Sequence, residues 1–130
     1  MKKLLTITIP SYNAQDDLPV VLDNLIKCSC LEKLEVIIVN DGSNDNTAQI
    51  AQKYADVYPT SIQIVNKENG GHGSTINTGI RLARGKYFKV VDSDDWLDPI
   101  WLDKFIKQLE SEKVDVLFNP FWTYDDKTKK

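Results

Sequence analysis

The sequence has very little cysteine and histidine, the residues that stabilise many small domains through disulfide bonds or zinc sites. Cys28 and Cys30 are the only cysteines, and His72 is the only histidine, among its 130 residues. Cysteine and histidine alone therefore cannot complete a four-ligand zinc site, and we expect both thiols to be reduced and structural. With 42% hydrophobic and 27% charged residues, the composition predicts one soluble globular domain with a core of its own.

Long apolar runs and an excess of basic charge are also missing. No segment approaches the roughly 18 to 20 apolar residues of a membrane span, and Pro10 ends the first apolar run too early for a signal peptide. The 16 Lys and Arg residues against 19 Asp and Glu leave a net charge of −3, which provides no basic surface for nucleic acid. We therefore expect a cytoplasmic protein with no nucleic-acid partner and no membrane span in this chain.

Strand-like and helix-like segments alternate along the chain. Short apolar or β-branched runs predict strands at residues 4–9, 36–39, 62–65, 87–91 and 114–118. Apolar residues at helical spacing predict helices between them, at residues 16–26, 47–58, 74–84 and 99–109. This alternation predicts an α/β fold with a mostly parallel sheet, in which each helix serves as a right-handed crossover.

Particular residues predict where these helices begin and end. Asp16 and Ser74 are suitable N-caps, and Asp98 before Pro99 is suitable for the last helix. Gly85 stands where a left-handed residue closes the third helix. These boundaries place the loops between strands and helices.

Polar residues follow three of the predicted strands. They read Pro-Ser-Tyr-Asn at residues 10–13, Asn-Asp-Gly-Ser at residues 40–43 and Asp-Ser-Asp-Asp at residues 92–95. In an open parallel sheet, ligands bind at the carboxyl ends of strands where the strand order reverses. Three closely spaced carboxylates repel one another unless a cation offsets their charge, and they suit Mg²⁺ or Mn²⁺ together with a diphosphate.

Each of these segments also has a purely structural explanation. Asp41 can accept hydrogen bonds from a ribose or a base, or it can cap a turn. Tyr12 offers a flat face for stacking, or it fills its own loop. Residues 92–95 bind a cation, or they form a solvated turn. We expect His72 to pack within its glycine-rich loop rather than act as a general base.

The order of these motifs resembles that of family 2 glycosyltransferases with the GT-A fold. The resemblance rests on Thr-Ile-Pro-Ser-Tyr-Asn at residues 8–13, a strand with Asn-Asp-Gly-Ser at residues 36–43, Asn-x-Gly at residues 69–71 and 77–79, and Gly-Lys-Tyr through Asp-Ser-Asp-Asp at residues 85–95. It covers nearly the whole chain. It implies a Rossmann-like, nucleotide-sugar-binding fold.

The resemblance also implies a reaction and a cofactor. Such enzymes are inverting hexosyltransferases that move a sugar from a nucleotide-activated donor, most often a UDP-sugar, to a hydroxyl of a glycan, lipid or protein acceptor. Their Asp-x-Asp motif holds Mg²⁺ or Mn²⁺, which offsets charge on the departing diphosphate. Synthesis of a polysaccharide or cell-envelope glycan, at the periphery of the membrane in the full-length protein, fits this class.

The family's site residues carry over to matching positions of this sequence. The implied nucleotide-binding residues are Pro10, Tyr12, Asp41 and Asp92. Asp94 matches the metal ligand of the Asp-x-Asp motif, and Asp95 can share either role. Two positions depart from the family pattern, because Ile76 stands where an Arg or Lys is common and Gly73 replaces a common serine.

We expect residues 1–130 to form a single donor-binding domain that lacks its C-terminal, acceptor-binding part. Family members carry the catalytic base in that part, so we expect the base beyond Lys130 and name none here. The apolar residues Phe121 and Trp122, with nothing downstream to pack on, point to the same truncation.

Two other functions stay open at this point. A nucleotide-binding module without turnover is one, because the chain contains the donor half and no base. A sugar-phosphate nucleotidylyltransferase is the other, because Gly-Gly-His-Gly-Ser-Thr at residues 70–75 loosely matches its glycine-rich motif. That motif belongs after the first strand, whereas here it follows the third.

Overall fold

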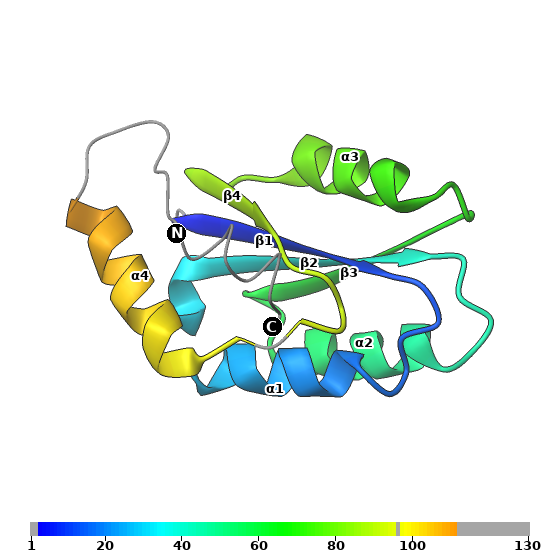
Figure 1. Cartoon of the computed structure of the whole chain (residues 1–130), viewed down its shortest axis with the longest axis horizontal. Coiled ribbons are helices and arrows are strands. Elements are labelled where there is room, and N and C mark those ends of the chain that lie inside the picture. The colour runs from blue at the N-terminus through cyan, green and yellow to red at the C-terminus, as the bar shows by residue number, and fades with distance from the viewer. Residues whose placement is uncertain (1–2, 96, 112–130) are drawn as a thin grey trace.

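The computed structural model describes residues 3–95 and 97–111 of the chain. Four strands in this part form one parallel sheet with the order β3-β2-β1-β4 (Figure 1). The strands are β1 (Leu5–Ser11), β2 (Leu34–Asp41), β3 (Ile62–Lys67) and β4 (Tyr87–Val90). The chain adds β2 and β3 on one side of β1 and then returns to add β4 on the other. The α/β fold with a parallel sheet is thus confirmed, and the strand order reverses between β1 and β4.

Helices connect the strands and cover both faces of the sheet (Figure 1). α1 (Leu18–Lys27) and α2 (Thr47–Val57) lie along one face, and α3 (His72–Leu82) lies along the other. A short 3₁₀ helix, η1 (Leu31–Lys33), precedes β2, and α4 (Pro99–Ser111) packs beside α1. Within residues 3–95 and 97–111, no helix has the length and apolar character needed to cross a membrane.

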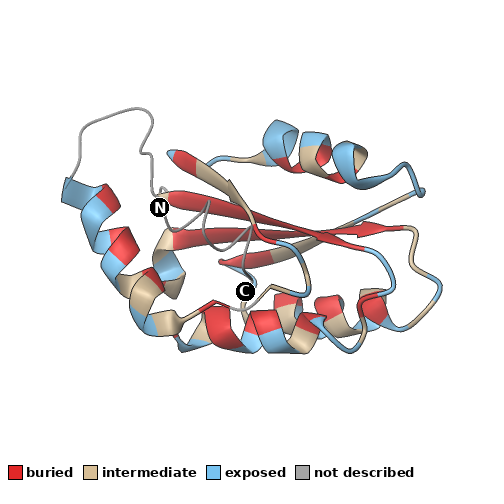
Figure 2. Cartoon of the chain, in the orientation of Figure 1, coloured by how far each residue is buried: buried red, intermediate tan, exposed pale blue. Residues whose placement is uncertain are grey.

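The core lies between the sheet and the α1–α2 layer. Both β1 and β2 are buried along their whole length (Figure 2). Leu5, Ile7 and Ile9 of β1 alternate with the residues that face α3, and α1 contributes buried residues such as Leu18 and Leu22. Burying each such side chain contributes about 1.5–3 kcal/mol. Burial on both faces is why residues 36–39 of β2 form an uninterrupted apolar run.

α3 approaches the sheet closely because it carries a glycine at the contact. A Cβ at Gly79 would lie 2.5 Å from Cγ2 of Thr8 and closer still to its Oγ1. Gly85 makes a similar approach to β1, since a Cβ there would lie 2.6 Å from the backbone nitrogen of Thr6. A glycine is therefore needed at position 85, because any side chain there would collide with β1. The expectation that it adopts a left-handed conformation is wrong, because the described glycines with positive φ are Gly42 and Gly71.

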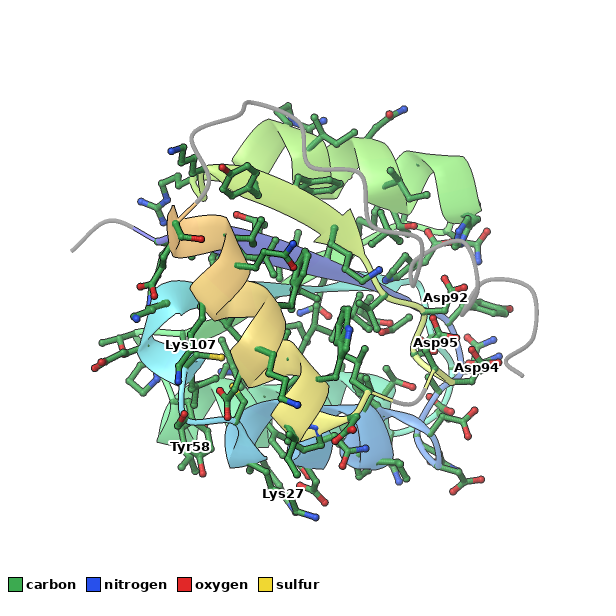
Figure 3. All side chains as sticks on the ribbon, turned by 60° about the vertical axis from the view of Figure 1, so that its left-hand side comes forward. Lys27, Tyr58, Asp92, Asp94, Asp95 and Lys107 are labelled. Atoms are coloured by element: carbon green, nitrogen blue, oxygen red, sulfur yellow. The ribbon has the colours of Figure 1, made fainter. Side chains whose placement is uncertain are left out.

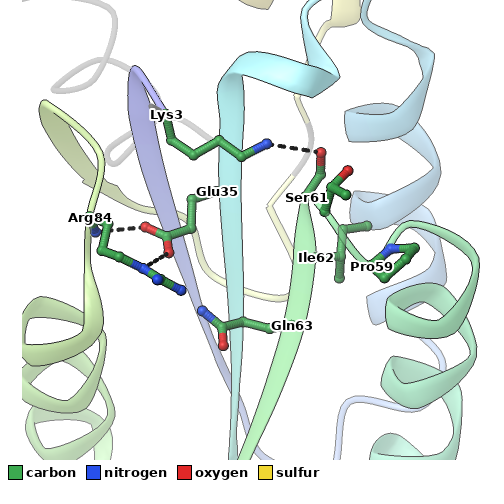
Figure 4. A pocket seen from close by; sticks show the side chains of 8 residues that line it. Lys3, Glu35, Pro59, Ser61, Ile62, Gln63 and Arg84 are labelled. Carbon is green, nitrogen blue, oxygen red and sulfur yellow. Dashed lines mark hydrogen bonds and ion pairs between the residues drawn. The ribbon is translucent and has the colours of Figure 1, made fainter. Parts of the chain in front are cut away.

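A buried carboxylate ties the amino ends of the strands together. Glu35 of β2 accepts hydrogen bonds from Oγ1 of Thr6 at 2.7 Å and from the backbone N–H of Arg84 at 2.7 Å. Beside it, Lys3 donates to Oγ of Ser61 at 3.4 Å (Figure 4). Glu35, Arg84, Lys3 and Ser61 line a cavity of about 440 Å³. The cavity lies at the end of the sheet opposite to the polar segments that the sequence singled out.

Two helix starts differ from the sequence-based expectation. α1 has Asp17, not Asp16, at its N-cap, and that side chain makes no capping hydrogen bond. The first turn needs no side-chain cap, because the N–H of Leu18 donates to the carbonyl of Ala14 at 2.9 Å, Pro19 has no N–H, and the N–H of Val20 donates to the carbonyl of Asp17 at 3.1 Å. α3 begins at His72 rather than after Ser74, since Gly71 turns the chain with φ 94°.

Other expected features are confirmed or lie elsewhere. Asp98 caps α4, because its Oδ1 accepts from the backbone N–H of Ile100 at 3.1 Å. Cys28 and Cys30 are free thiols and are buried. The fifth predicted strand, residues 114–118, and the aromatic residues after Pro120 lie outside the described residues.

The contact between Gly79 and Thr8 predicts a stability difference between two glycines of α3. We expect Gly79→Ala to lower the free energy of unfolding by about 1–3 kcal/mol, because the added methyl group overpacks the helix–sheet contact. Gly73→Ala is the matched control, since a Cβ there meets nothing within 4 Å. The control should be neutral or stabilising by up to about 1 kcal/mol, because alanine favours the helix. Urea unfolding measures both, and a Gly79→Ala variant as stable as the wild type would contradict the packing described.

Candidate functional site

The carboxyl ends of β1 and β2 and the segment after β4 meet at one edge of the sheet. Two adjoining cavities lie there, with volumes of about 250 Å³ and about 400 Å³. Both are lined by Pro10, Tyr12 and His72. The smaller cavity adds Asp41 and the larger one adds the first residues of the acidic segment after β4. The structure thus brings together the three polar segments predicted from the sequence.

Asp41 lies at the end of β2 and holds the loop that follows β3. Its Oδ1 accepts from the backbone N–H of Gly70 at 2.9 Å and from Nζ of Lys67 at 3.1 Å, while Oδ2 accepts from the N–H of Gly71 at 3.1 Å. The side chain is only 6% exposed. A carboxylate has about four acceptor positions, so these three donors leave little room for another.

The surroundings of Asp41 favour its ionised form. Burial raises the pKa of this carboxyl, but the hydrogen bonds from Gly70, Lys67 and Gly71 and the charge of Lys67 lower it by more, so that the pKa lies below its ordinary value. Asp41 is therefore a fixed negative charge at neutral pH, and it positions the glycine-rich loop against the cavity.

Tyr12 projects from the turn after β1 and is 52% exposed. Its neighbour Asn13 adopts a left-handed conformation with φ 49°. The backbone N–H of Asn13 donates to Oγ of Ser43 at 2.9 Å, and its Oδ1 accepts from the N–H of Asn44 at 2.8 Å. The turn after β1 is therefore tied to the turn after β2, and the aromatic face of Tyr12 stays accessible instead of filling its own loop.

A second aspartate, Asp45, strengthens the same junction. Its Oδ1 accepts from the backbone N–H of Thr47 at 3.0 Å, and its Oδ2 accepts from the N–H of Gln15 at 3.3 Å. Burial raises the pKa of Asp45, but the hydrogen bonds from Thr47 and Gln15 lower it by more, and the net direction is downward. Asn13 belongs to a polar segment that the sequence singled out, but neither Asn13 nor Asp45 was predicted to join the two turns. Two features of the sequence could have indicated these roles. Asn13 is an asparagine, a residue type that tolerates a left-handed backbone, and Asp45 is an aspartate two residues before the predicted start of a helix at Thr47.

The acidic segment after β4 forms a compact turn at the cavity edge. Oxygen atoms of the Asp92, Asp94 and Asp95 carboxylates lie within 4.8 Å of one another, and Figure 3 shows the three residues on the same edge of the sheet. Asp92 and Asp94 are exposed and line the larger cavity. Asp95 is partly buried, and its Oδ2 accepts from the N–H of Asp92 at 3.1 Å. Asp95 thus shapes the turn that presents the other two.

This donor set fits the cation that the sequence predicts. Carboxylate oxygens are hard ligands, and Mg²⁺ and Mn²⁺ bind through one or two of them while keeping other positions for water or phosphate. Asp92 and Asp94 satisfy that requirement because they are exposed and face the cavity.

His72 lies closer to the site than the sequence indicated. It is the first residue of α3, its side chain is 62% exposed, and its Nε2 is 3.8 Å from Oδ1 of Asp92. The expectation that it packs within the loop is wrong, because the helix starts early enough to leave the ring outside. Ile76, one turn further along α3, is partly buried. His72 is thus the basic side chain that α3 presents to both cavities.

Together these groups can bind a ligand with three chemically different parts. Tyr12 offers a flat apolar face, Asn69 and Gly71 of the loop held by Asp41 line the smaller cavity, and Asp92 and Asp94 offer oxygen ligands for a cation. A molecule with an aromatic ring, a polar middle and a metal-bound anionic end matches this order.

Comparisons with known proteins identify the chain's relatives. The model of the family described as "Glycosyl transferase family 2" matches residues 6–130. The uncharacterized glycosyltransferase EpsJ of Bacillus subtilis is 33% identical over 117 residues, which are 90% of this chain and 33% of that protein. The chain therefore spans about a third of the length of this relative.

Solved structures show the same fold. Staphylococcus aureus TarS 1–349 in complex with UDP-GlcNAc matches with a TM-score of 0.74 at 27% identity, over 82% of this chain and 31% of that one. The mannosyltransferase PcManGT of Pyrobaculum calidifontis, in complex with GDP-Man and Mn²⁺, matches with a TM-score of 0.75 at 25% identity, over 96% of this chain and 38% of that one. The GT-A-like architecture expected from the sequence is confirmed over the matched part.

The hydrogen bonds around Asp41 predict a pH-dependent contribution to stability. At neutral pH we expect Asp41→Asn to lower the free energy of unfolding by about 1–3 kcal/mol, because a charged acceptor of three donors is lost. Folding lowers the pKa of Asp41. The difference in free energy of unfolding between wild type and Asp41→Asn therefore has its full size at pH values above the ordinary pKa of a carboxyl group. It is lost as the pH falls through the lowered value.

Urea unfolding of both proteins between neutral pH and about pH 3 measures this difference. Asp16→Asn, which changes an exposed aspartate before α1, is the control and should differ little from the wild type at any pH. If the difference in free energy of unfolding between Asp41→Asn and wild type stays constant or widens on acidification, the ionised state assigned to Asp41 is contradicted.

Proposed function

The chain belongs to glycosyl transferase family 2, and we propose that residues 1–130 form the donor-binding part of an enzyme that transfers a sugar from a nucleoside diphosphate to a hydroxyl acceptor. The observation that carries this proposal is the meeting of Tyr12, Asp41 and the acidic segment at 92–95 around two adjoining cavities. Relatives are longer, since this chain spans about a third of EpsJ. The transfer itself is therefore a proposal for the whole protein.

The nucleoside occupies the part of the site next to β1 and β2. Its base stacks on Tyr12 beside Pro10, and the loop held by Asp41 contacts the ribose or base. The matched structures contain UDP-GlcNAc in one case and GDP-Man in the other. We propose a UDP-sugar as the donor, as is most common in the family that the sequence resembles, with GDP as the alternative nucleotide.

The diphosphate and its metal ion occupy the part next to the acidic segment. Asp94, with Asp92 toward the ribose, would hold Mg²⁺ or Mn²⁺, and Asp95 would support them by fixing the turn. Bound there, the ion would act as a Lewis acid that offsets charge on the departing nucleoside diphosphate. The presence of Mn²⁺ with GDP-Man in the PcManGT complex supports this assignment.

The residues of this chain supply binding and orientation to the reaction. Tyr12 and the Asp41-held loop fix the nucleoside, so the sugar is directed past the acidic segment toward the open side of the larger cavity. Transfer with inversion requires an acceptor hydroxyl that loses its proton to a base. We assign no such base among the described residues. Cytoplasmic location and a role in glycan synthesis stay predictions.

A nucleotide-binding module without turnover is the second candidate. It is favoured by one observation, that the described residues hold groups suited to the donor and none that we assign to acceptor activation. The nucleotidylyltransferase alternative is weaker, because the glycine-rich segment that begins at residue 69 follows β3 rather than β1. Metal-dependent hydrolysis of a UDP-sugar by the chain favours an active donor site, whereas binding without sugar release favours the module.

The metal assignment predicts the behaviour of Asp94→Ala. We expect the wild-type chain to bind UDP saturably in calorimetric titration, and more tightly with Mn²⁺ than without it. Asp94→Ala should lose the gain due to Mn²⁺ and keep the metal-free affinity, because only the oxygen ligand is removed. Asp56→Ala, which removes an exposed carboxylate of α2 outside both cavities, should behave as wild type. An Mn²⁺-dependent gain that persists in Asp94→Ala would overturn this assignment.

The stacking role predicts a different pattern for Tyr12. Tyr12→Ala should weaken UDP binding by about 1–3 kcal/mol, the usual range for a base on an aromatic ring, whether Mn²⁺ is present or not. Tyr12→Phe should bind nearly as well as wild type, because it keeps the ring and removes only the hydroxyl. Equal affinities of wild type and Tyr12→Ala in the same titration would show that the base lies elsewhere.

A further inference from the structure

Three potential metal ligands meet on the side of the fold where α1 ends and α4 packs against it. Sγ of Cys28, Sγ of Cys30 and a carboxylate oxygen of Asp103 lie within 4.8 Å of one another. The two sulfur atoms are 3.0 Å apart, and the cysteines are only 5% and 6% exposed. None of the three lines the cavities at the carboxyl ends of the strands.

The carboxylate is held toward the thiols by the backbone. The N–H of Ser29 donates to both oxygens of Asp103, at 3.0 Å and 3.2 Å. The thiol of Cys30 lies within hydrogen-bonding reach of the same carboxylate and of Cys28. The ligand atoms are therefore already gathered, and the two sulfur atoms have to separate only from 3.0 Å to about 3.8 Å, the spacing of two thiolates on one tetrahedral zinc ion.

The electrostatics of this cluster favour a cation. Cys28 is the C-cap of α1, where the partial negative charge of the helix end adds to that of Asp103. The neighbouring ammonium of Lys33 is paired with Glu110. The two sulfur atoms and the carboxylate are thus gathered at a helix C-terminus, where a positive charge is favoured.

We propose that Cys28, Cys30 and Asp103 form a binding site for a thiophilic divalent cation of the zinc type. Two thiolates and one carboxylate supply three ligands, and water fills the fourth position of a tetrahedron. Each thiol transfers its proton to solvent as its bond to the metal forms, so two protons are released for each ion and nothing is oxidised. The site links α1 to α4, the helix that follows the acidic segment, and it does not depend on the proposed sugar transfer.

Cobalt titration of the reduced, metal-free chain tests this proposal. Co²⁺ replaces Zn²⁺ in such sites and reports thiolate ligation through a near-ultraviolet charge-transfer band. We expect this band to saturate at one ion per chain, to vanish when Zn²⁺ is added, and to appear with the release of about two protons per ion in weakly buffered solution. A phosphine reductant keeps the thiols reduced without competing as a thiol. Absence of the band in the wild-type chain would overturn the proposal without any variant.

Variants separate this site from the acidic segment. Cys28→Ser and Cys30→Ser should each abolish the two-thiolate band, and Asp103→Asn should keep it while weakening Co²⁺ binding by about tenfold or more. Asp94→Ala should leave band and affinity unchanged, because its carboxylate lies in the other cluster. Far-ultraviolet circular dichroism checks folding. Unchanged affinity in Asp103→Asn, or a full band in either serine variant, would contradict the three-ligand site.

Discussion

The parallel pairing of β1 with β2 on one side and β4 on the other is the constraint from which the site follows. Ser11 pairs with Asn40, and Thr8 pairs with Val90, so all three strands end at the same edge of the sheet. The segments that follow them diverge at this edge because the strand order reverses between β1 and β4. A space opens there without cost to the core, and the polar residues after each strand line it.

Backbone N–H groups hold the acidic side chains of the loops that line this space. Asp41 is held by two backbone N–H groups of the glycine-rich loop as well as by Lys67, and Asp95 is held by the N–H of Asp92. Such bonds position the loops with little dependence on flexible side chains. Tyr12, Asp92 and Asp94 are left exposed beside them, which is where a ligand with an aromatic base and a metal-bound diphosphate can make contact.

Features that depend on neighbouring residues in sequence could be predicted, and those that depend on tertiary contact could not. The β-branched residues of β1 and the apolar run at residues 36–39 of β2 predicted both strands, and the predicted start of α2 at Thr47 is confirmed. The role of Gly85 was predicted wrongly, because its close approach to Thr6 is a tertiary contact that the neighbouring residues in the sequence do not indicate. The junction at Asn13 and the cluster around Asp103 join residues far apart in the chain, so spacing within the sequence could not reveal either.

We propose that a nucleoside diphosphate and its metal ion bind at the edge of the sheet where the strand order reverses between β1 and β4. Nuclear magnetic resonance of the labelled chain with UDP and a small amount of Mn²⁺ tests it most directly, because the ion broadens the amide signals of nearby residues. We expect broadening at residues 92–95, at His72 and at Tyr12, with the amides near Glu35 and Arg84 at the opposite end of the sheet unaffected. Broadening centred on Glu35 and Arg84, or spread evenly over the chain, would contradict it.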